Sequence, residues 1–115
     1  MSEARRARGI RGEDVAAAWY ASQGYELVAR NWRCRTGELV LIVRRGPTFV
    51  FCEVKSKGGP GFGDPLEMVT EEKVRRVRRA AEAWLAARPR YREFEVRFDV
   101  VVERGRRLEC LRAAF

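Results

Sequence analysis

The segment GELVLIVRRGPTFVFCEVKSK, residues 37–57, predicts two strands joined by a tight turn. Both arms are mostly apolar, and Gly46-Pro47 between them is a turn sequence that closes a hairpin. Because successive side chains of a strand point to opposite faces, Glu53 and Lys55 should share a face with Phe51. The hairpin therefore places a carboxylate and an ammonium group together near the end of its second strand.

The pair formed by Glu53 and Lys55 has two interpretations. In one, the strand emerges into solvent and the pair forms its hydrated rim. In the other, the carboxylate holds a divalent metal on a phosphodiester, while the ammonium group stabilises charge or positions a water. The pattern Glu-x-Lys is common by chance, but here a helix with an acid precedes the hairpin and a basic helix follows it. That context favours the functional interpretation.

Six short motifs cover nearly the whole chain. They are, in order, Gly12-Glu13, Gly24-Tyr25, Asn31-Trp32-Arg33, Gly37-Glu38-Leu39, Phe51-Cys52-Glu53-Val54-Lys55 and Arg97-Phe98-Asp99-Val100-Val101. This order resembles the YraN-like family of small bacterial proteins, which is similar to archaeal Holliday-junction resolvases. The resemblance implies an α/β restriction-endonuclease-like fold, whose PD-(D/E)xK motif places an aspartate on one strand and Glu-x-Lys on the next.

The same resemblance implies a function, the cleavage of branched or distorted DNA by Mg²⁺- or Mn²⁺-dependent hydrolysis of phosphodiesters. The catalytic residues that it implies are Glu13, Glu53 and Lys55, with Glu53 as a metal ligand. Without the resemblance, Glu13 is an acid in the first turn of a helix, where the helix dipole favours negative charge.

One position departs from the family pattern. After the glycine that pattern reads Gly-Glu-(apolar)-Asp-(apolar)-Ile, and this chain has Val40 in the aspartate position. Valine offers no ligand atom, whereas Mg²⁺ takes oxygen donors. Glu38 lies about 6 to 7 Å along the same strand face and is the candidate replacement, so the predicted metal ligands are Glu53 and Glu38, with weak binding. The chain is then either an impaired nuclease or a non-catalytic DNA-binding module that uses the same cleft.

Composition bounds the class of protein. A chain of 115 residues with 46% hydrophobic residues fits one folded domain, which we place at residues 9–115 after a flexible basic arm at 1–8. The net charge of +8 comes mainly from arginine, whose planar fork suits phosphate oxygens. Nucleic acid is therefore the expected partner. A protein that is merely basic and a binder of acidic protein surfaces are the alternatives, and the second leaves the motif residues unexplained.

Several functions are excluded by what the sequence lacks. It has neither a run of about 20 apolar residues for a membrane span nor the apolar core of a secretory signal, so we expect a cytoplasmic protein. It has no histidine, and Cys34, Cys52 and Cys110 are widely spaced, which argues against a zinc site and a disulfide framework. Catalysis would have to use carboxylates, lysine and metal. The sequence leaves open the preferred DNA structure and the oligomeric state, a homodimer included.

The periodicity of the chain predicts the order α-β-β-β-α-β-β, a mixed sheet flanked by helices. The expected elements are a helix over 9–23 ended by Gly24, strands over 25–33, 38–44 and 48–57, a Gly/Pro-rich loop over 58–65, a helix from Thr70 to Arg88, and strands over 95–103 and up to Leu111. In the first helix, Val15, Ala18, Trp19 and Ser22 share one face. The loop either folds over a bound DNA backbone or is an ordinary connection.

The second helix carries a dense group of arginines on its exposed surface. Such a group repels itself in solution and is relieved by phosphates, which favours a DNA-contacting face over a plainly solvated one. The predicted DNA-binding residues are Arg5, Arg8, Lys73, Arg75, Arg76 and Arg79. Lys73 is equally well interpreted as a surface lysine. Asp99 is predicted to be structural, paired with an arginine in or near the sheet.

Overall fold

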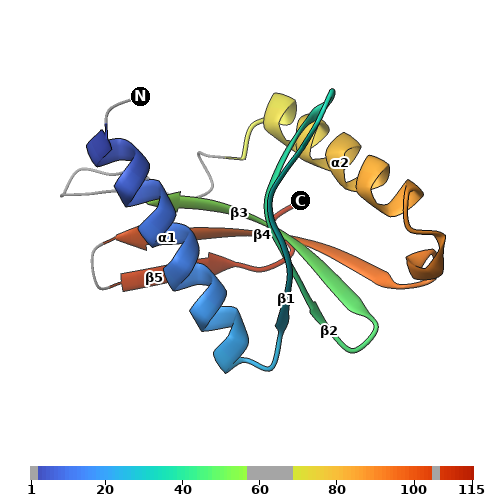
Figure 1. The fold of residues 1–115 in the computed structure, drawn as a ribbon, viewed down its shortest axis with the longest axis horizontal. Helices are drawn as coiled ribbons and strands as arrows, with labels where there is room; N and C mark the ends of the chain where they lie inside the picture. The colour runs from blue at the N-terminus through green and yellow to red at the C-terminus, as the bar shows by residue number, and fades with distance from the viewer. Residues whose placement is uncertain (1–2, 57–68, 105–106) are drawn as a thin grey trace.

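A mixed sheet with one helix packed on each face forms the part of the chain that the structure describes (Figure 1). The computed structural model describes residues 3–56, 69–104 and 107–115, and at 4–9 and 56 it describes only the backbone. The elements are α1 (Glu3–Ser22), β1 (Glu26–Cys34), β2 (Gly37–Arg45), β3 (Thr48–Ser56), α2 (Glu71–Ala86), the short 3₁₀ helix η2 (Pro89–Tyr91), β4 (Glu95–Arg104) and β5 (Arg107–Leu111). The predicted loop over 58–65 lies outside the described residues.

The strands lie in the order β1-β2-β3-β4-β5. Neighbours are antiparallel except β3 and β4, which run parallel from Thr48↔Glu95 to Ser56↔Glu103. Parallel neighbours need a crossover connection, and α2 lies in that connection. The predicted mixed α/β sheet flanked by helices is confirmed. The predicted hairpin is also confirmed, because Gly46 has φ 57° and the flanking residues Arg45 and Thr48 pair.

Two hydrophobic clusters fill the space between the sheet and the helices. The cluster under α1 contains Ala16, Tyr20, Tyr25, Leu41, Val43, Val50, Cys52, Val54 and Val101. The cluster under α2 contains Leu39, Ile42, Phe49, Phe51, Val77, Ala80, Ala81 and Trp84. Along β3 the side chains alternate between the two, as the period of a strand requires. The odd-numbered face of β3, which begins with Phe49 and Phe51, is therefore the face toward α2.

The structure corrects the expected start of α1 and shows which of its residues are buried. The helix begins at Glu3 rather than near Gly9, so the backbone of 3–8, predicted as a flexible arm, continues it. Alanine and arginine are good helix formers and one glycine does not stop them. Ala16 and Tyr20 are fully buried, while Ala18 and Ser22 are exposed. Tyr20 can be buried because its hydroxyl has a polar partner.

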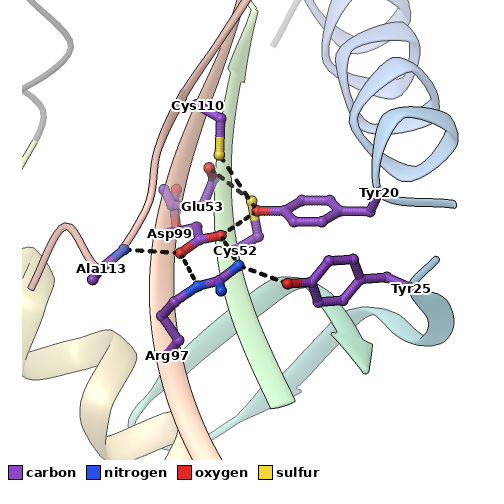
Figure 2. A network of polar contacts seen from close by, with 8 residues as sticks. All are labelled: Tyr20, Tyr25, Cys52, Glu53, Arg97, Asp99, Cys110 and Ala113. Carbon is purple, nitrogen blue, oxygen red and sulfur yellow. Dashed lines mark hydrogen bonds and ion pairs between the residues drawn. The ribbon is translucent and has the colours of Figure 1, made fainter. Parts of the chain in front are cut away.

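That partner is the carboxylate of Asp99, which is completely buried and accepts four hydrogen bonds (Figure 2). Tyr20 donates from α1 at 2.7 Å, Arg97 donates twice from β4 at 2.9 Å, and the backbone N–H of Ala113 donates at 3.0 Å. Burial raises the pKa of Tyr20, which keeps its hydroxyl a donor. The hydrogen bond to Asp99 raises the pKa of Arg97. The predicted pairing of Asp99 with an arginine is confirmed.

Strand β1 is interrupted by a bulge that the sequence did not reveal. Leu27 pairs with Val43 and Ala29 pairs with Ile42, so Val28 is the extra residue. Val28 and Ala29 consequently both pack against the α2 cluster, and Leu27 is 53% exposed. Simple alternation predicts Leu27 and Ala29 on one face of this strand and Val28 on the other, and the bulge makes that prediction wrong.

Both ends of α2 confirm the sequence signals. The hydroxyl of Thr70 accepts a hydrogen bond from the backbone N–H of Lys73 at 3.1 Å, which caps the first turn. The helix ends at Ala86, shortly before Pro89. Among the helices described, none is long and apolar enough to span a membrane.

Tyr20→Phe should lower the free energy of unfolding by about 1–3 kcal/mol, because it takes a hydroxyl donor away from the buried Asp99 carboxylate. Urea denaturation followed by circular dichroism measures the loss. Tyr91→Phe removes the same atom from a ring that stacks on Trp84 in the other cluster, and it should cost less. Equal losses in the two variants would contradict the importance of this hydrogen bond.

Candidate functional site

Glu53 is a nearly buried carboxylate near the end of β3, with 8% of its surface exposed. It follows Phe51 on the face toward α2, in line with the face predicted from the sequence. A buried carboxylate is costly unless charged or hydrogen-bonding groups surround it. The charged partners of Glu53 therefore determine which ligands this end of the sheet could bind.

Two ammonium groups contact the same oxygen of Glu53. Lys73, from the first turn of α2, lies 3.3 Å from Oε1, and Lys55, from the same strand, lies 3.5 Å from it. Burial lowers the pKa of Lys73, and the neighbouring ammonium of Lys55 lowers it further while Glu53 opposes the shift. The sequence left open whether Lys73 is a surface lysine, and the structure shows that only 28% of its side chain is exposed.

Lys73 reaches Glu53 because α2 lies close to the start of β2. A Cβ atom at Gly37 would lie 3.1 Å from the backbone carbonyl oxygen of Arg76, closer than most side chains tolerate. Glycine at this position lets the β1–β2 hairpin approach the backbone of α2, beside which it runs in Figure 1. The Thr70 cap fixes the first turn of the same helix. Together these features bring the lysine over the sheet.

The groups around Glu53 line an open cavity of about 290 Å³, which we call the Glu53 cavity. Its described lining is Gly37, Glu38, Val40, Glu53, Lys55, Lys73, Arg76 and Val77. The three basic side chains outnumber the two acidic ones, so the lining carries a net positive charge at neutral pH. Such a cavity is suited to an anion.

The predicted catalytic acid of α1 lies elsewhere among the described residues. Glu13 accepts hydrogen bonds from Arg30 at 3.2 Å and from Asn31 at 2.9 Å, and it is not among the residues that line the Glu53 cavity. Asn31 has φ 52°, a left-handed backbone that asparagine adopts more readily than most residues. Sequence reasoning did not single out Arg30 or predict this contact. A catalytic role for Glu13 stays a prediction.

The two remaining positions of the predicted metal site, Glu38 and Val40, do line the cavity. Glu38 is 3.6 Å from the guanidinium of Arg33; the side chain of Arg33 is 78% exposed and that of Glu38 is 38% exposed. Each of the three acids in the predicted site, Glu13, Glu38 and Glu53, therefore has a basic partner. Among the described residues, no group of three or more His, Cys, Asp or Glu side chains is arranged to hold a metal ion. The residues present, two lysines and a valine beside Glu53, do not fit Mg²⁺, which takes oxygen ligands.

The arginines predicted to contact DNA are exposed on α2. Arg75, Arg76 and Arg79 are solvent-accessible, and Arg76 also lines the cavity and pairs with Glu72 at 3.6 Å. Arg78 instead lies over the ring of Phe98, with its guanidinium carbon 5.5 Å from the ring centroid. This cation–π contact gives one arginine of the group a structural role. The side chains of the predicted contacts Arg5 and Arg8 lie outside the description, and their backbone belongs to α1.

The three cysteines, Cys34, Cys52 and Cys110, are free thiols. Burial raises the pKa of Cys52 and of Cys110, whereas a hydrogen bond with Thr36 lowers the pKa of Cys34. In the described part of the chain none of them lines the Glu53 cavity.

Fold and cavity together define a small α/β domain with a basic cavity at one end of its sheet. The chain belongs to the Uncharacterised protein family UPF0102, whose family model matches residues 12–102. A UPF0102 protein of Acidothermus cellulolyticus is 45% identical over 99% of this chain and 97% of its own length. One of Frankia casuarinae is 47% identical over 97% of this chain and 98% of its own. The predicted membership of the YraN-like family is thereby confirmed.

Glu53→Gln should lower the free energy of unfolding by about 1–2 kcal/mol at neutral pH, because Lys55 and Lys73 then face each other without a carboxylate. Removing one ammonium group as well, in Glu53→Gln/Lys73→Met, should restore most of the loss. Chemical denaturation of the three proteins gives the comparison. If the double variant is no more stable than the single one, repulsion between the lysines is not what Glu53 relieves.

Proposed function

We propose that this protein binds DNA through backbone phosphates, using the Glu53 cavity and the exposed arginine face of α2. The observation that carries the proposal is the convergence of Lys55, Lys73 and Arg76 on one cavity. Arg75 and Arg79 are exposed on the same helix as Lys73 and Arg76. A net charge of +8 supports it, because a positive protein attracts polyanions at long range.

The proposal extends to the fold. A restriction-endonuclease-like arrangement, similar to that of archaeal Holliday-junction resolvases, agrees with a mixed sheet between two helices and with Glu53 and Lys55 near the end of β3. The valine of the motif, Val40, lines the same cavity as Glu53. Branched or otherwise distorted DNA is the substrate class that this relationship suggests, and a homodimer is compatible with it.

Contacts to phosphate explain the mixture of charges in the cavity. Guanidinium and ammonium groups bind the non-bridging oxygens of a phosphodiester through charge-assisted hydrogen bonds. When a phosphate enters, Lys55 and Lys73 can share their donors between it and Glu53, since each ammonium group has three. Such contacts hold the backbone without reading the base sequence.

Phosphodiester hydrolysis with Mg²⁺ or Mn²⁺ is the second candidate function. It is favoured by Glu38, which lines the same cavity as Glu53 and Lys55 and is the one further carboxylate among the lining residues described. Glu53 and Glu38 are the oxygen donors that such chemistry would have, and Lys55 the group that would stabilise charge on the phosphate. We place it second because the lining does not fit the metal.

Binding to a four-way junction or a duplex should weaken steeply as salt rises. Each phosphate neutralised on duplex DNA contributes about −0.9 to the slope of log affinity against log salt concentration. Fluorescence anisotropy from low to moderate salt measures the slope. Arg75→Gln/Arg79→Gln should make it shallower by about two, while the control Arg92→Gln/Arg107→Gln, with exposed arginines outside α2, should not. An affinity that does not depend on salt would contradict backbone binding.

Lys55→Ala separates the two candidate functions. For a binding module, it should lower DNA affinity about three- to tenfold, because one phosphate contact is lost. For a nuclease, it should leave affinity nearly unchanged and abolish cleavage, because the charge acts mainly on the transition state. Anisotropy and a gel assay of cleavage with Mn²⁺ measure both properties on one preparation. Unchanged affinity together with lost cleavage would overturn the order in which we place the two functions.

A further inference from the structure

We infer that the ammonium group of Lys73 takes the place of a divalent cation beside Glu53, so that the cavity binds a phosphodiester anion directly and without metal. The anion half of this inference rests on the proposed function. The replacement of a metal by the Lys73 side chain does not depend on DNA binding, so it can be tested on the protein without DNA.

The geometry at Glu53 opposes the binding of a metal. One oxygen of its carboxylate lies 3.3 Å from the nitrogen of Lys73 and 3.5 Å from that of Lys55. A metal bound to this oxygen would stand close to both positive charges. Like charges at such distances repel strongly in a partly buried site, so the lysines oppose a metal there. They also neutralise the carboxylate, which is the task a metal would otherwise perform.

The described lining of the Glu53 cavity offers few oxygen donors to a metal. Val40 lines the cavity with methyl groups, and Glu38 is engaged by Arg33 at 3.6 Å. Among the lining residues described, Glu53 and Glu38 are the only carboxylates. Mg²⁺ and Mn²⁺ would have to compete with a basic partner for each of them. The same carboxylate that lacks further oxygen ligands for a metal beside it therefore has a lysine as its cation.

The backbone of Lys73 has a fixed place beside the sheet. It stands in the first turn of α2, where its own backbone N–H bonds to the cap residue Thr70 at 3.1 Å. The helix lies close to β2 at Gly37, where glycine permits the approach. From this position the ammonium group contacts the Glu53 carboxylate, as a bound cation would. One carboxylate between two ammonium groups leaves one positive charge for a phosphodiester, with Arg76 beside it.

The test is a double-mutant cycle on Mn²⁺ affinity. Electron paramagnetic resonance measures that affinity in the absence of DNA. The four proteins are the parent, Val40→Asp, Lys73→Met and Val40→Asp/Lys73→Met. The parent should bind Mn²⁺ weakly, Val40→Asp more tightly, and the double variant about tenfold more tightly than Val40→Asp. Arg75→Met is the matched control in the Val40→Asp background, because it removes the same charge from α2 outside the cavity lining. It should change Mn²⁺ affinity much less.

Two results would overturn the inference: tight Mn²⁺ binding by the parent, or equal affinities of Val40→Asp and the double variant. DNA affinity of the parent, measured with Mg²⁺ and with EDTA at matched ionic strength, tests the anion half and should be the same in both. A requirement for metal would refute direct binding. If the parent binds no DNA at all, the proposed function fails, yet the Mn²⁺ affinities still decide whether Lys73 stands in place of a metal.

Discussion

The buried carboxylate of Asp99 is the interaction on which the arrangement of this domain depends. Its hydrogen bonds come from α1 through Tyr20, from β4 through Arg97 and from the C-terminal segment through Ala113. An unpaired charge in this position would cost roughly several kcal/mol, the penalty known for buried ions. The three segments that carry the donors must therefore meet around the carboxylate. The requirement fixes α1 on one face of the sheet and leaves the opposite face to α2.

Glu53 is also a nearly buried carboxylate that needs charged partners, but its partners are of a different kind. Asp99 is completely buried and accepts its hydrogen bonds from Tyr20, from Arg97 and from the backbone of Ala113. Glu53 lies in an open cavity, and its partners are the ammonium groups of Lys55 and Lys73, whose side chains are 37% and 28% exposed. An ammonium group has three donors, so these two lysines can share theirs with an incoming anion.

Sequence reasoning predicted most of the fold because its signals were local. The turn at Gly46, the cap at Thr70 and the helix end at Gly24 each depend on the chemistry of one or two residues, and each is in the structure. The bulge at Val28 and the buried face of α1 were missed, because both depend on partners distant in the sequence. The spacing of apolar residues can indicate a helix, but it does not show which face of that helix contacts a polar partner on the sheet.

The candidate site was predicted in part for the same reason. Glu53, Lys55 and Glu38 lie on one hairpin, so alternation and pairing were enough to bring them to one cavity. The contact of Lys73 with Glu53 depends on how α2 crosses the sheet, which no local pattern encodes.

We have proposed that Lys73, and not a metal, neutralises the Glu53 carboxylate, and diffraction from a crystal of the parent protein soaked in Mn²⁺ is the direct test. Anomalous diffraction should show no manganese peak between Glu38 and Glu53, with both ammonium groups in contact with the Glu53 carboxylate. A strong peak there, with Lys73 displaced toward solvent, would contradict it.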